Sequence, residues 1–527
     1  MILVSGIRLA LSGSEREAAE KAFKILRISP AKALRWDLTR LSVDARHGQP
    51  KLVYTIAVTL KNPGEELRYK GKPGIRVEQD QPLVLPLGTA PLANRPVVCG
   101  FGPAGMFAAL LLARKGYRPL VLERGAPMDQ RVADVERFSA TGQLDPDSNI
   151  QFGEGGAGTF SDGKLTTRIG DSRCSFVTKT FLEHGAPAEI AIRQKPHLGT
   201  DLLRGVITSI REEILSLGGE ILFHTRLTGL ETKNGQLTAL ETTGGTIPCQ
   251  VCILAVGHSA RDVFDMVQKA GLELVCKPFS VGFRAEHLQS AIDKSLYHEA
   301  AGHPALPQGE YQLSQQLAGG RCVYTFCMCP GGQVVASASE EGGVVTNGMS
   351  YHARSGKNAN AAVVVSVDGR DFDQDPLKAI AFQRLLEKTA FAAGGGGYKA
   401  PASHMAAFLE GRAGLEVAQV EPTYDRGVTP ADLGSLLPEE LSGSLRQGLM
   451  AFERKIRGYT DPHAILTGLE TRTSSPVRLV RDESGQAPGL QGLYPCGEGA
   501  GYAGGIMSAA VDGLRMAQQV IQKYAPF

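Results

Sequence analysis

The sequence contains no apolar run long enough to cross a lipid bilayer. Its longest candidate, residues 106–113, is far shorter than the roughly 18 to 20 residues that a membrane-spanning helix needs. The sequence also has almost no excess of charge of either sign, because 56 Lys and Arg nearly balance 54 Asp and Glu and leave a net charge of +2. The chain as a whole therefore gives no electrostatic reason to expect a membrane or a nucleic acid as its main partner.

The nine cysteines lack the spacing of a disulfide framework or a zinc site. Cys249 and Cys252 form one C-x-x-C, but no second pair lies at zinc spacing and no helix opens at Cys252, so buried core cysteines are favoured and no metal site is predicted. Cys327 and Cys329 stand two apart on a predicted strand, where they would share one face as a weaker redox candidate. With no secretory leader ahead of them, the cysteines favour the reducing cytoplasm.

The length favours two or three domains, since 527 residues exceed the size at which one hydrophobic core keeps growing. Residues 1–90 predict a small α+β module plus a linker. Its expected elements are a strand at 2–9, a helix at 14–26 with Ser14 and Glu17 as a capping box, and a hairpin of strands 36–43 and 52–60. The module carries 15 Lys and Arg against nine Asp and Glu. An RNA or an anionic protein would match this balance, although a solvated face is the simpler interpretation.

The hydrophobic pattern of the rest of the chain changes twice. From residue 96, short apolar runs alternate with helical patterns, which is typical of a doubly wound parallel sheet. After residue 276 the alternation is typical of antiparallel strands, and 375–465 looks mostly helical before a strand at 476–480. We therefore predict an α/β fold with a discontinuous Rossmann-like nucleotide-binding domain and an inserted antiparallel or mixed substrate domain. Their predicted bounds are 91–275 with 476–527, and 276–475.

The strongest functional signal is a buried strand, a G-x-G-x-x-G loop and a buried helix in direct succession. Gly100 allows a tight turn, Gly102 lets the backbone approach a pyrophosphate, and Gly105 permits close packing of helix on strand. The next strand, 120–122, ends in Glu123, about 20 residues after the loop, where a carboxylate accepts hydrogen bonds from a ribose 2′-OH. This unit predicts a dinucleotide site.

The same residues, together with residues 492–498 and the helix that opens at residues 504–506, resemble the first and last cofactor segments of the glutathione-reductase-like FAD superfamily. The resemblance implies bound FAD. Glu498 would contact the ribityl chain or pyrophosphate, Gly257 would pass near the adenine, and residues 149–165 resemble a flavin-contacting loop. The motif and the resemblance together assign these residues to the cofactor: Gly100, Gly102, Pro103, Ala104, Gly105, Glu123, Arg124, Gly155, Gly156, Ala157, Gly158, Thr159, Ser161, Asp162, Gly257, Gly497, Glu498, Gly504, Gly505 and Ile506.

Over its whole length the chain also resembles a bacterial family named only as FAD-dependent dehydrogenases, including its stretches 339–350 and 470–476. This resemblance implies an FAD-dependent oxidoreductase that acts on a small molecule. Glycine patterns at 153–158 and 499–504 open no complete βαβ unit, so no second, resident NAD(P) domain is expected. NADH, NADPH, a quinone or oxygen stays open as a diffusible redox partner.

The catalytic candidates are Lys399, His404 and Arg472, polar residues ahead of a flavin-facing segment. Arg472 is suited to bind a carboxylate, and His404 or Tyr398 to transfer a proton. Two other hypotheses stay open: a flavoprotein whose N-terminal module binds RNA or a protein while FAD is structural, and an NAD-dependent enzyme without flavin.

Overall fold

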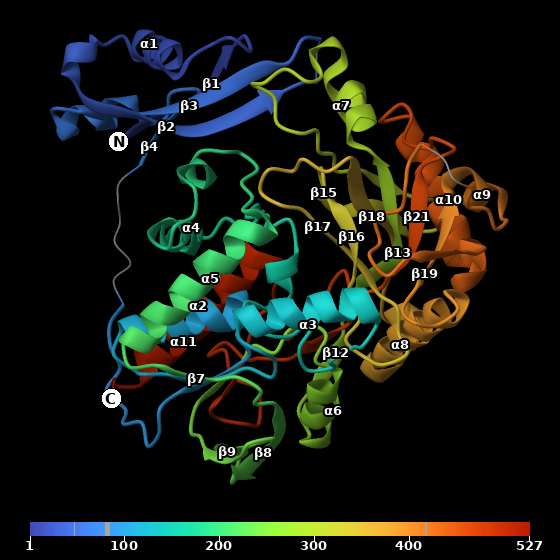
Figure 1. Ribbon diagram of the computed structural model, residues 1–527. Helices are drawn as coiled ribbons and strands as arrows, with labels where there is room; N and C mark the ends of the chain where they lie inside the picture. Colours follow the sequence, from blue (N-terminus) through green and yellow to red (C-terminus); the bar gives the residue numbers. More distant parts are fainter. Residues whose placement is uncertain (47, 79–84, 417–418, 527) are drawn as a thin grey trace. The chain divides into compact units, whose positions relative to one another are not determined.

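The computed structural model (Figure 1) describes residues 1–46, 48–78, 85–416 and 419–526. The chain forms two compact units. Unit 1 comprises Met1–Val84, Pro187–His197 and Ser290–Gly309, and unit 2 comprises Leu85–Ala186, Leu198–Gln289 and Glu310–Phe527. The two later segments of unit 1 fall within stretches that the sequence assigns to the nucleotide and substrate domains. The linker predicted within residues 1–90 lies partly outside the described residues. Within the described ranges, no helix is both long and apolar enough to cross a membrane.

Unit 1 contains a four-stranded antiparallel sheet in the order β2-β3-β1-β4, with helix α1 packed on one face. The Ser14 hydroxyl accepts the Glu17 N–H over 3.2 Å and so caps α1. Phe23 on α1 and Ile56 on β3 belong to the same buried core. The elements are β1 (Ile2–Leu9), α1 (Glu15–Leu26), η1 (Pro30–Lys32), β2 (Ala33–Asp44), β3 (Lys51–Leu60), η2 (Pro63–Tyr69), β4 (Ile75–Val77), η4 (Ala188–Ala191), most of α7 (Gln289–Tyr297) and η5 (His298–Ala300).

The first part of unit 2 is built on a five-stranded parallel sheet in the order β23-β11-β5-β6-β7. Helices α2, α5 and α11 lie side by side (Figure 1), and α2 is buried along nearly its whole length. The strands are β5 (Val97–Cys99), β6 (Leu120–Leu122), β7 (Glu220–Leu222), β11 (Cys252–Leu254) and β23 (Leu493–Pro495). The helices are α2 (Pro103–Arg114), α3 (Met128–Thr141), η3 (Gly156–Phe160), α4 (Arg173–Glu183), α5 (Gly199–Ser216), α6 (Arg261–Lys269) and α11 (Ile506–Lys523). This sheet confirms the predicted Rossmann-like α/β fold.

The second part of unit 2 centres on a seven-stranded sheet in the order β14-β15-β18-β13-β21-β19-β20. Its pairs are antiparallel except β19 with β20. The sheet strands are β13 (Phe279–Leu288), β14 (Ser314–Gln316), β15 (Cys322–Cys329), β18 (Asn358–Val367), β19 (Ala400–His404), β20 (Val428–Pro430) and β21 (Ile465–Glu470). The helices are η6 (Gly369–Phe372), α8 (Pro376–Ala393), α9 (Met405–Glu410), η7 (Leu433–Leu436) and α10 (Glu439–Glu453).

Three smaller sheets complete unit 2. They are β8 (Leu227–Lys233), β9 (Gln236–Thr242) and β10 (Gly245–Pro248); β12 (Leu274–Cys276) with β22 (Val477–Leu479); and β16 (Gln333–Ala336) with β17 (Thr346–Met349). The strands of the parallel sheet all come from 91–275 and 476–527, while the boundaries of the two predicted domains stay a prediction.

Two local expectations need correction. The stretch 375–465 contains strands as well as helices, because β19 and β20 pass through it as short members of the large sheet, where Pro401 and Pro430 disfavour a helix. Cys327 and Cys329 do not sit on a regular strand: β15 bulges between Phe326 and Cys329, so the rule that residues two apart share one face does not hold there. Cys249 and Cys252 are fully buried, as predicted, although Cys249 directly follows β10 and only Cys252 lies on β11.

Candidate functional site

A cavity opens in unit 2 beside the carboxyl ends of β5, β6 and β11. It contains about 1510 Å³ of space, part of which is open to solvent. The chain runs from β5 to β6 and β7 on one side and later adds β11 and β23 on the other. The cavity therefore lies at the point where the strand order reverses, which is where ligands bind in open parallel sheets.

The glycine loop after β5 supplies one wall, and its three glycines differ in what limits them. A Cβ at Gly100, where φ is +97°, would lie 2.4 Å from the Ala255 carbonyl oxygen. A Cβ at Gly105 would lie 1.9 Å from the Gly100 oxygen. At Gly102 the nearest atom to such a Cβ is the Gly156 Cα at 3.7 Å. Gly100 and Gly105 are therefore required by backbone packing, whereas the space beside Gly102 belongs to the cavity.

Glu123, at the end of β6, holds the surrounding loops together. Its carboxylate accepts backbone N–H groups from Phe101 over 2.7 Å, and from Gly125 and Gly153 over 2.9 Å each. The side chain is buried and lines the cavity. A carboxylate has about four lone-pair positions, so it can accept a further hydroxyl donor beside these three amides.

The loop at 149–160 forms the neighbouring wall and is fixed by Arg131 of α3, whose side chain is fully buried. Arg131 donates to the carbonyl oxygens of Asn149 and Ile150 over 3.0 Å each, and to that of Glu154. Its guanidinium therefore replaces water on three carbonyls of a glycine-rich turn. No sequence pattern indicates this role, since a lone arginine on a helix is ordinarily exposed.

The C-terminal segment closes the same cavity. Burial raises the pKa of Glu498 to about 7, although the Gly505 N–H and Lys277 oppose this shift. The Oε1 atom of Glu498 lies 3.6 Å from the Nδ1 atom of His258. Burial, with Arg472 and Arg261 nearby, lowers the pKa of His258 to about 3, so its imidazole is neutral near pH 7.

The opposite wall comes from residues beyond 160. Lys164 donates to Asp162 over 2.5 Å and to the carbonyl oxygen of Met328. Arg284, fully buried on β13, donates to both carboxylate oxygens of Glu470, and burial raises the pKa of that carboxyl to about 7. The side chains on this wall of the cavity include Lys164, Phe326, Cys327, Asn347, Glu470 and Arg472.

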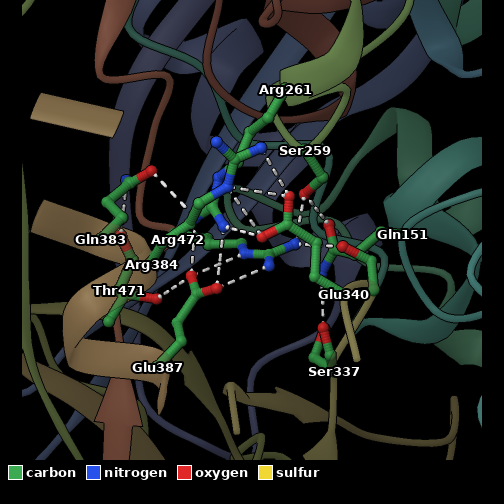
Figure 2. A network of polar contacts seen from close by, with 11 residues as sticks. Gln151, Ser259, Arg261, Ser337, Glu340, Gln383, Arg384, Glu387, Thr471 and Arg472 are labelled. Carbon is green, nitrogen blue, oxygen red and sulfur yellow. Dashed lines mark hydrogen bonds and ion pairs between the residues drawn. The ribbon is translucent and has the colours of Figure 1, made fainter. Parts of the chain in front are cut away.

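A buried ionic network stands behind this wall (Figure 2). Glu387 of α8 accepts hydrogen bonds from Arg261 and Arg472 through both oxygens, over 2.7–3.0 Å. Burial opposes ionisation of Glu387, yet the two arginines hold the pKa of its carboxyl well below the usual value. Arg261 also binds Glu340 over 2.7 Å. The network therefore joins the start of α6 to the helices and loops that flank the large sheet.

The predicted catalytic residues end up in different places. Arg472 lines the cavity, but its guanidinium donates to Glu387, Ser259 and Ser339 and so has little capacity left for a substrate carboxylate. Lys399 is exposed and His404 is buried on β19, where its Nε2 contacts the backbone of Glu416 over 2.8 Å and 3.0 Å. Neither lines the cavity.

Most of the predicted cofactor residues do meet at this cavity. The residues lining it are Gly100, Gly102, Pro103, Ala104, Glu123, Arg124, Gly156, Ala157, Gly158, Ser161, Asp162, Gly257, Glu498, Gly505 and Ile506. The others lie in the adjacent backbone: Gly105, Gly155, Thr159, Gly497 and Gly504. Their cofactor roles stay predictions. His258 also lines the cavity but was not predicted from the sequence, although its position directly after Gly257 could have indicated it.

The cavity has the features that a dinucleotide needs. Helices α2 and α11 both begin at its edge with glycine N-caps and without a side-chain cap. Their first N–H groups and positive dipole ends therefore suit a diphosphate or another anionic group. The Nε2 atom of His258 is buried and has no hydrogen-bond partner within the part of the chain that the structure describes. A bound group with both anionic and hydrogen-bonding parts fits these residues.

Comparison with known proteins agrees with this site. Residues 278–473 match the family described as "FAD-dependent protein, C-terminal domain-like". An uncharacterised protein of Clostridium beijerinckii is 45% identical over 527 residues, which cover 99% of each chain.

Among solved structures, the glycine oxidase of Geobacillus kaustophilus is 12% identical over 82% of this chain and 96% of its own, with a TM-score of 0.35. The L-amino acid deaminase of Proteus vulgaris, with its specific insertion deleted, is 11% identical over 84% and 93%, with a TM-score of 0.34. Likeness at these TM-scores supports no inference about the substrate.

The fold, the cavity and the match of residues 278–473 together identify a protein that uses FAD. The chain belongs to the same family as the Clostridium beijerinckii protein. Its expected membership of the glutathione-reductase-like superfamily stays a prediction.

Proposed function

We propose that this protein transfers hydride or electrons through FAD between a small-molecule substrate and a second, diffusible redox partner. The observation that carries the proposal is the meeting of two uncapped helix N-termini and the Glu123 carboxylate at one cavity beside the parallel sheet. NADH and NADPH are candidates for the diffusible partner. The nine cysteines are all free, which supports the cytoplasm as the compartment.

Each part of the cavity has a proposed role toward FAD. The α2 N-terminus at Gly102 and Pro103 holds the diphosphate, and Glu123 accepts hydrogen bonds from the ribose. Gly257 lies along the adenine side. The glycine loop at 156–158 and the α11 N-terminus at Gly505 face the flavin end.

Flavin supplies the redox chemistry, while the chain supplies position and charge. The positive end of α11 favours the negative charge that flavin gains on reduction. Glu498 holds or releases a proton near neutral pH, because burial raises its pKa to about 7. Its neighbour His258 stays neutral. The His258 Nε2 atom has no hydrogen-bond partner among the described residues, so it can form a hydrogen bond with a bound group.

Ion pairs on the surface of unit 1 argue against the hypothesis of an RNA-binding module. Several exposed arginines of unit 1 are paired with carboxylates, such as Arg8 with Asp44 over 3.3 Å and Arg35 with Asp37 over 3.4 Å. Positive charge is therefore partly compensated within the unit, so we do not propose a nucleic-acid partner.

Gly102→Ala tests the proposed FAD site directly. The added Cβ meets only the Gly156 Cα at 3.7 Å and φ is −77°, so the chain should fold as before while the methyl group occupies space meant for the diphosphate. FAD titration followed by flavin fluorescence should give at least about a tenfold weaker affinity, which is about 1.4 kcal/mol.

The matched control is Gly205→Ala on helix α5, where a Cβ has nothing within 4 Å and FAD affinity should not change. A colourless purified protein that also fails to take up added FAD would refute the proposal. So would a Gly102→Ala variant of normal thermal stability that binds FAD as tightly as the wild type.

A further inference from the structure

The chain makes an irregular turn at Cys327, inside strand β15. Register with β18 is lost between Phe326 and Cys329, and Cys327 has φ of +43°, a left-handed conformation that costs a non-glycine residue roughly 1–2 kcal/mol. The bulge takes the carbonyl groups of residues 327 and 328 out of the ladder. Arg284 donates to the Cys327 carbonyl over 2.7 Å, and Lys164 donates to the Met328 carbonyl. Two cations therefore fix a strained backbone.

This turn gives the two cysteines unequal positions. Cys327 is partly exposed and lines the cavity, whereas Cys329 is fully buried behind it. The Cys329 thiol donates to the Cys327 carbonyl oxygen over 3.4 Å. Cys327 thus lines the cavity, and the Cys329 sulfur lies against the backbone of Cys327.

The charges around Cys327 favour its thiolate. The nearby Cys329 thiol lowers the pKa of Cys327 to about 6 against the effect of burial, and the cations Arg284 and Lys164 add to the shift. Carboxyl groups on three other segments face the same sulfur and oppose ionisation: Asp162, Glu470 and Glu498. The Cys327 sulfur and, after it, burial raise the pKa of Cys329, which stays a thiol.

We propose that Cys327 is a site of oxidation by hydroperoxides, with Cys329 as the resolving thiol. The Cys327 thiolate attacks one peroxide oxygen, the O–O bond breaks, and the leaving oxygen takes a proton to give water or an alcohol. The product is a sulfenic acid at Cys327. The Cys329 sulfur then attacks the Cys327 sulfur, and the S–O bond breaks as the S–S bond forms. The oxygen leaves as water with the Cys329 proton.

The pair thereby gives up two electrons to the peroxide. This inference goes beyond the proposed function and needs no flavin, so its failure would leave the FAD site untouched. Oxidation would replace the Cys327 thiolate on the wall of the cavity, beside Arg284 and Lys164, by a disulfide.

Peptide mass spectrometry after treatment of the purified protein with hydrogen peroxide at pH 7 tests the proposal. In the wild type, the peptide that contains Cys327 and Cys329 should lose the mass of two hydrogen atoms, and reduction by dithiothreitol should restore it. In Cys329→Ser the reaction should stop at the sulfenic acid, which dimedone traps on Cys327.

Cys174 and Cys276 are matched controls, because both are partly exposed and burial raises the pKa of each thiol. Cys327 should be oxidised about tenfold faster than either control or more, since the thiolate is the reactive form. Its alkylation by iodoacetamide should rise through about pH 6. Equal oxidation of Cys174 and Cys327, or a wild-type peptide whose mass does not change while Cys174 reacts, would overturn the proposal without any variant.

Discussion

Arg284 donates to both carboxylate oxygens of Glu470, over 2.8 Å and 3.0 Å, and neither side chain is more than 5% exposed. Glu470 lines the proposed flavin cavity, whereas Arg284 reaches it from the middle of the large sheet. The ionisation of the buried Glu470 carboxyl group therefore affects a side chain that lines the cavity and the arginine that holds it in place.

The Glu470→Gln variant should separate charge from shape at this position. Burial raises the pKa of Glu470 in the folded protein to about 7, above its ordinary 4.5. The stabilising contribution of the protonated form is complete below pH 4.5 and is lost as pH rises through 7. Relative to Glu470→Gln, the wild type should therefore lose up to about 3 kcal/mol of unfolding free energy across this window. Urea unfolding at a series of pH values measures the difference, and a difference independent of pH would contradict the raised pKa.

Gly105→Ala should destabilise the fold. Its Cβ would lie 1.9 Å from the Gly100 oxygen, so helix α2 must move away from β5. Overpacking of this kind costs about 1–3 kcal/mol or more. Thermal unfolding of the FAD-free protein measures the loss, with Gly205→Ala as the control, because alanine in that helix should raise stability by about 0.5–1 kcal/mol. Equal melting temperatures for the two variants would show that Gly105 is not packed as described.

Glu387→Gln should be among the most damaging single changes away from the cavity. It leaves Arg261 and Arg472 buried without their shared carboxylate, which commonly costs about 3–5 kcal/mol. Because the folded pKa of Glu387 is lowered, the stability it adds is present above its ordinary pKa of 4.5 and falls as pH drops below that value. Denaturant unfolding at pH 7 tests the size of the effect. Glu440→Gln is the comparison. Glu440 forms an ion pair with Arg321 but is 72% exposed, so removing its charge should have little effect on stability.

Glu123→Gln should weaken FAD binding and loosen the loops around it. The amide offers one acceptor oxygen to three backbone N–H groups, and its own NH₂ must face at least one of them. Each buried donor left unpaired costs about 1–3 kcal/mol. FAD titration should show weaker affinity, and hydrogen exchange should show faster exchange at Phe101 and Gly153. Unchanged exchange together with unchanged affinity would remove Glu123 from its proposed role.

Lys399→Ala should leave flavin properties unaltered, because Lys399 is exposed and does not line the cavity. Lys164→Gln should alter the rate of flavin reduction by an artificial reductant, since this cation belongs to the cavity wall. Stopped-flow reduction by dithionite measures both variants under anaerobic conditions. A large change in the rate of flavin reduction in Lys399→Ala alone would instead support a catalytic role for Lys399.

The sequence predicted what is local in the chain. The strand, glycine loop and helix after residue 96 lie within about 30 residues, and each glycine carries its own steric signal. The network at Glu387 could not be predicted in this way, because its partners Arg261 and Arg472 are 126 and 85 residues away and a charged residue on a helix is ordinarily solvated. The bulge at Cys327 was missed for a similar reason: cations from two distant segments hold it.

The order of the parallel sheet has a consequence for how the protein is made. Strand β23 occupies one edge beside β11, and α11 packs along α2, which was synthesised some four hundred residues earlier. During translation, the glycine loop is therefore exposed to the cell long before the segment that completes its pocket leaves the ribosome. A chain truncated before that segment would keep the glycine loop and Glu123 but would lack Glu498 and the α11 N-terminus, so we expect it to bind FAD poorly even though its first phosphate-binding loop is complete.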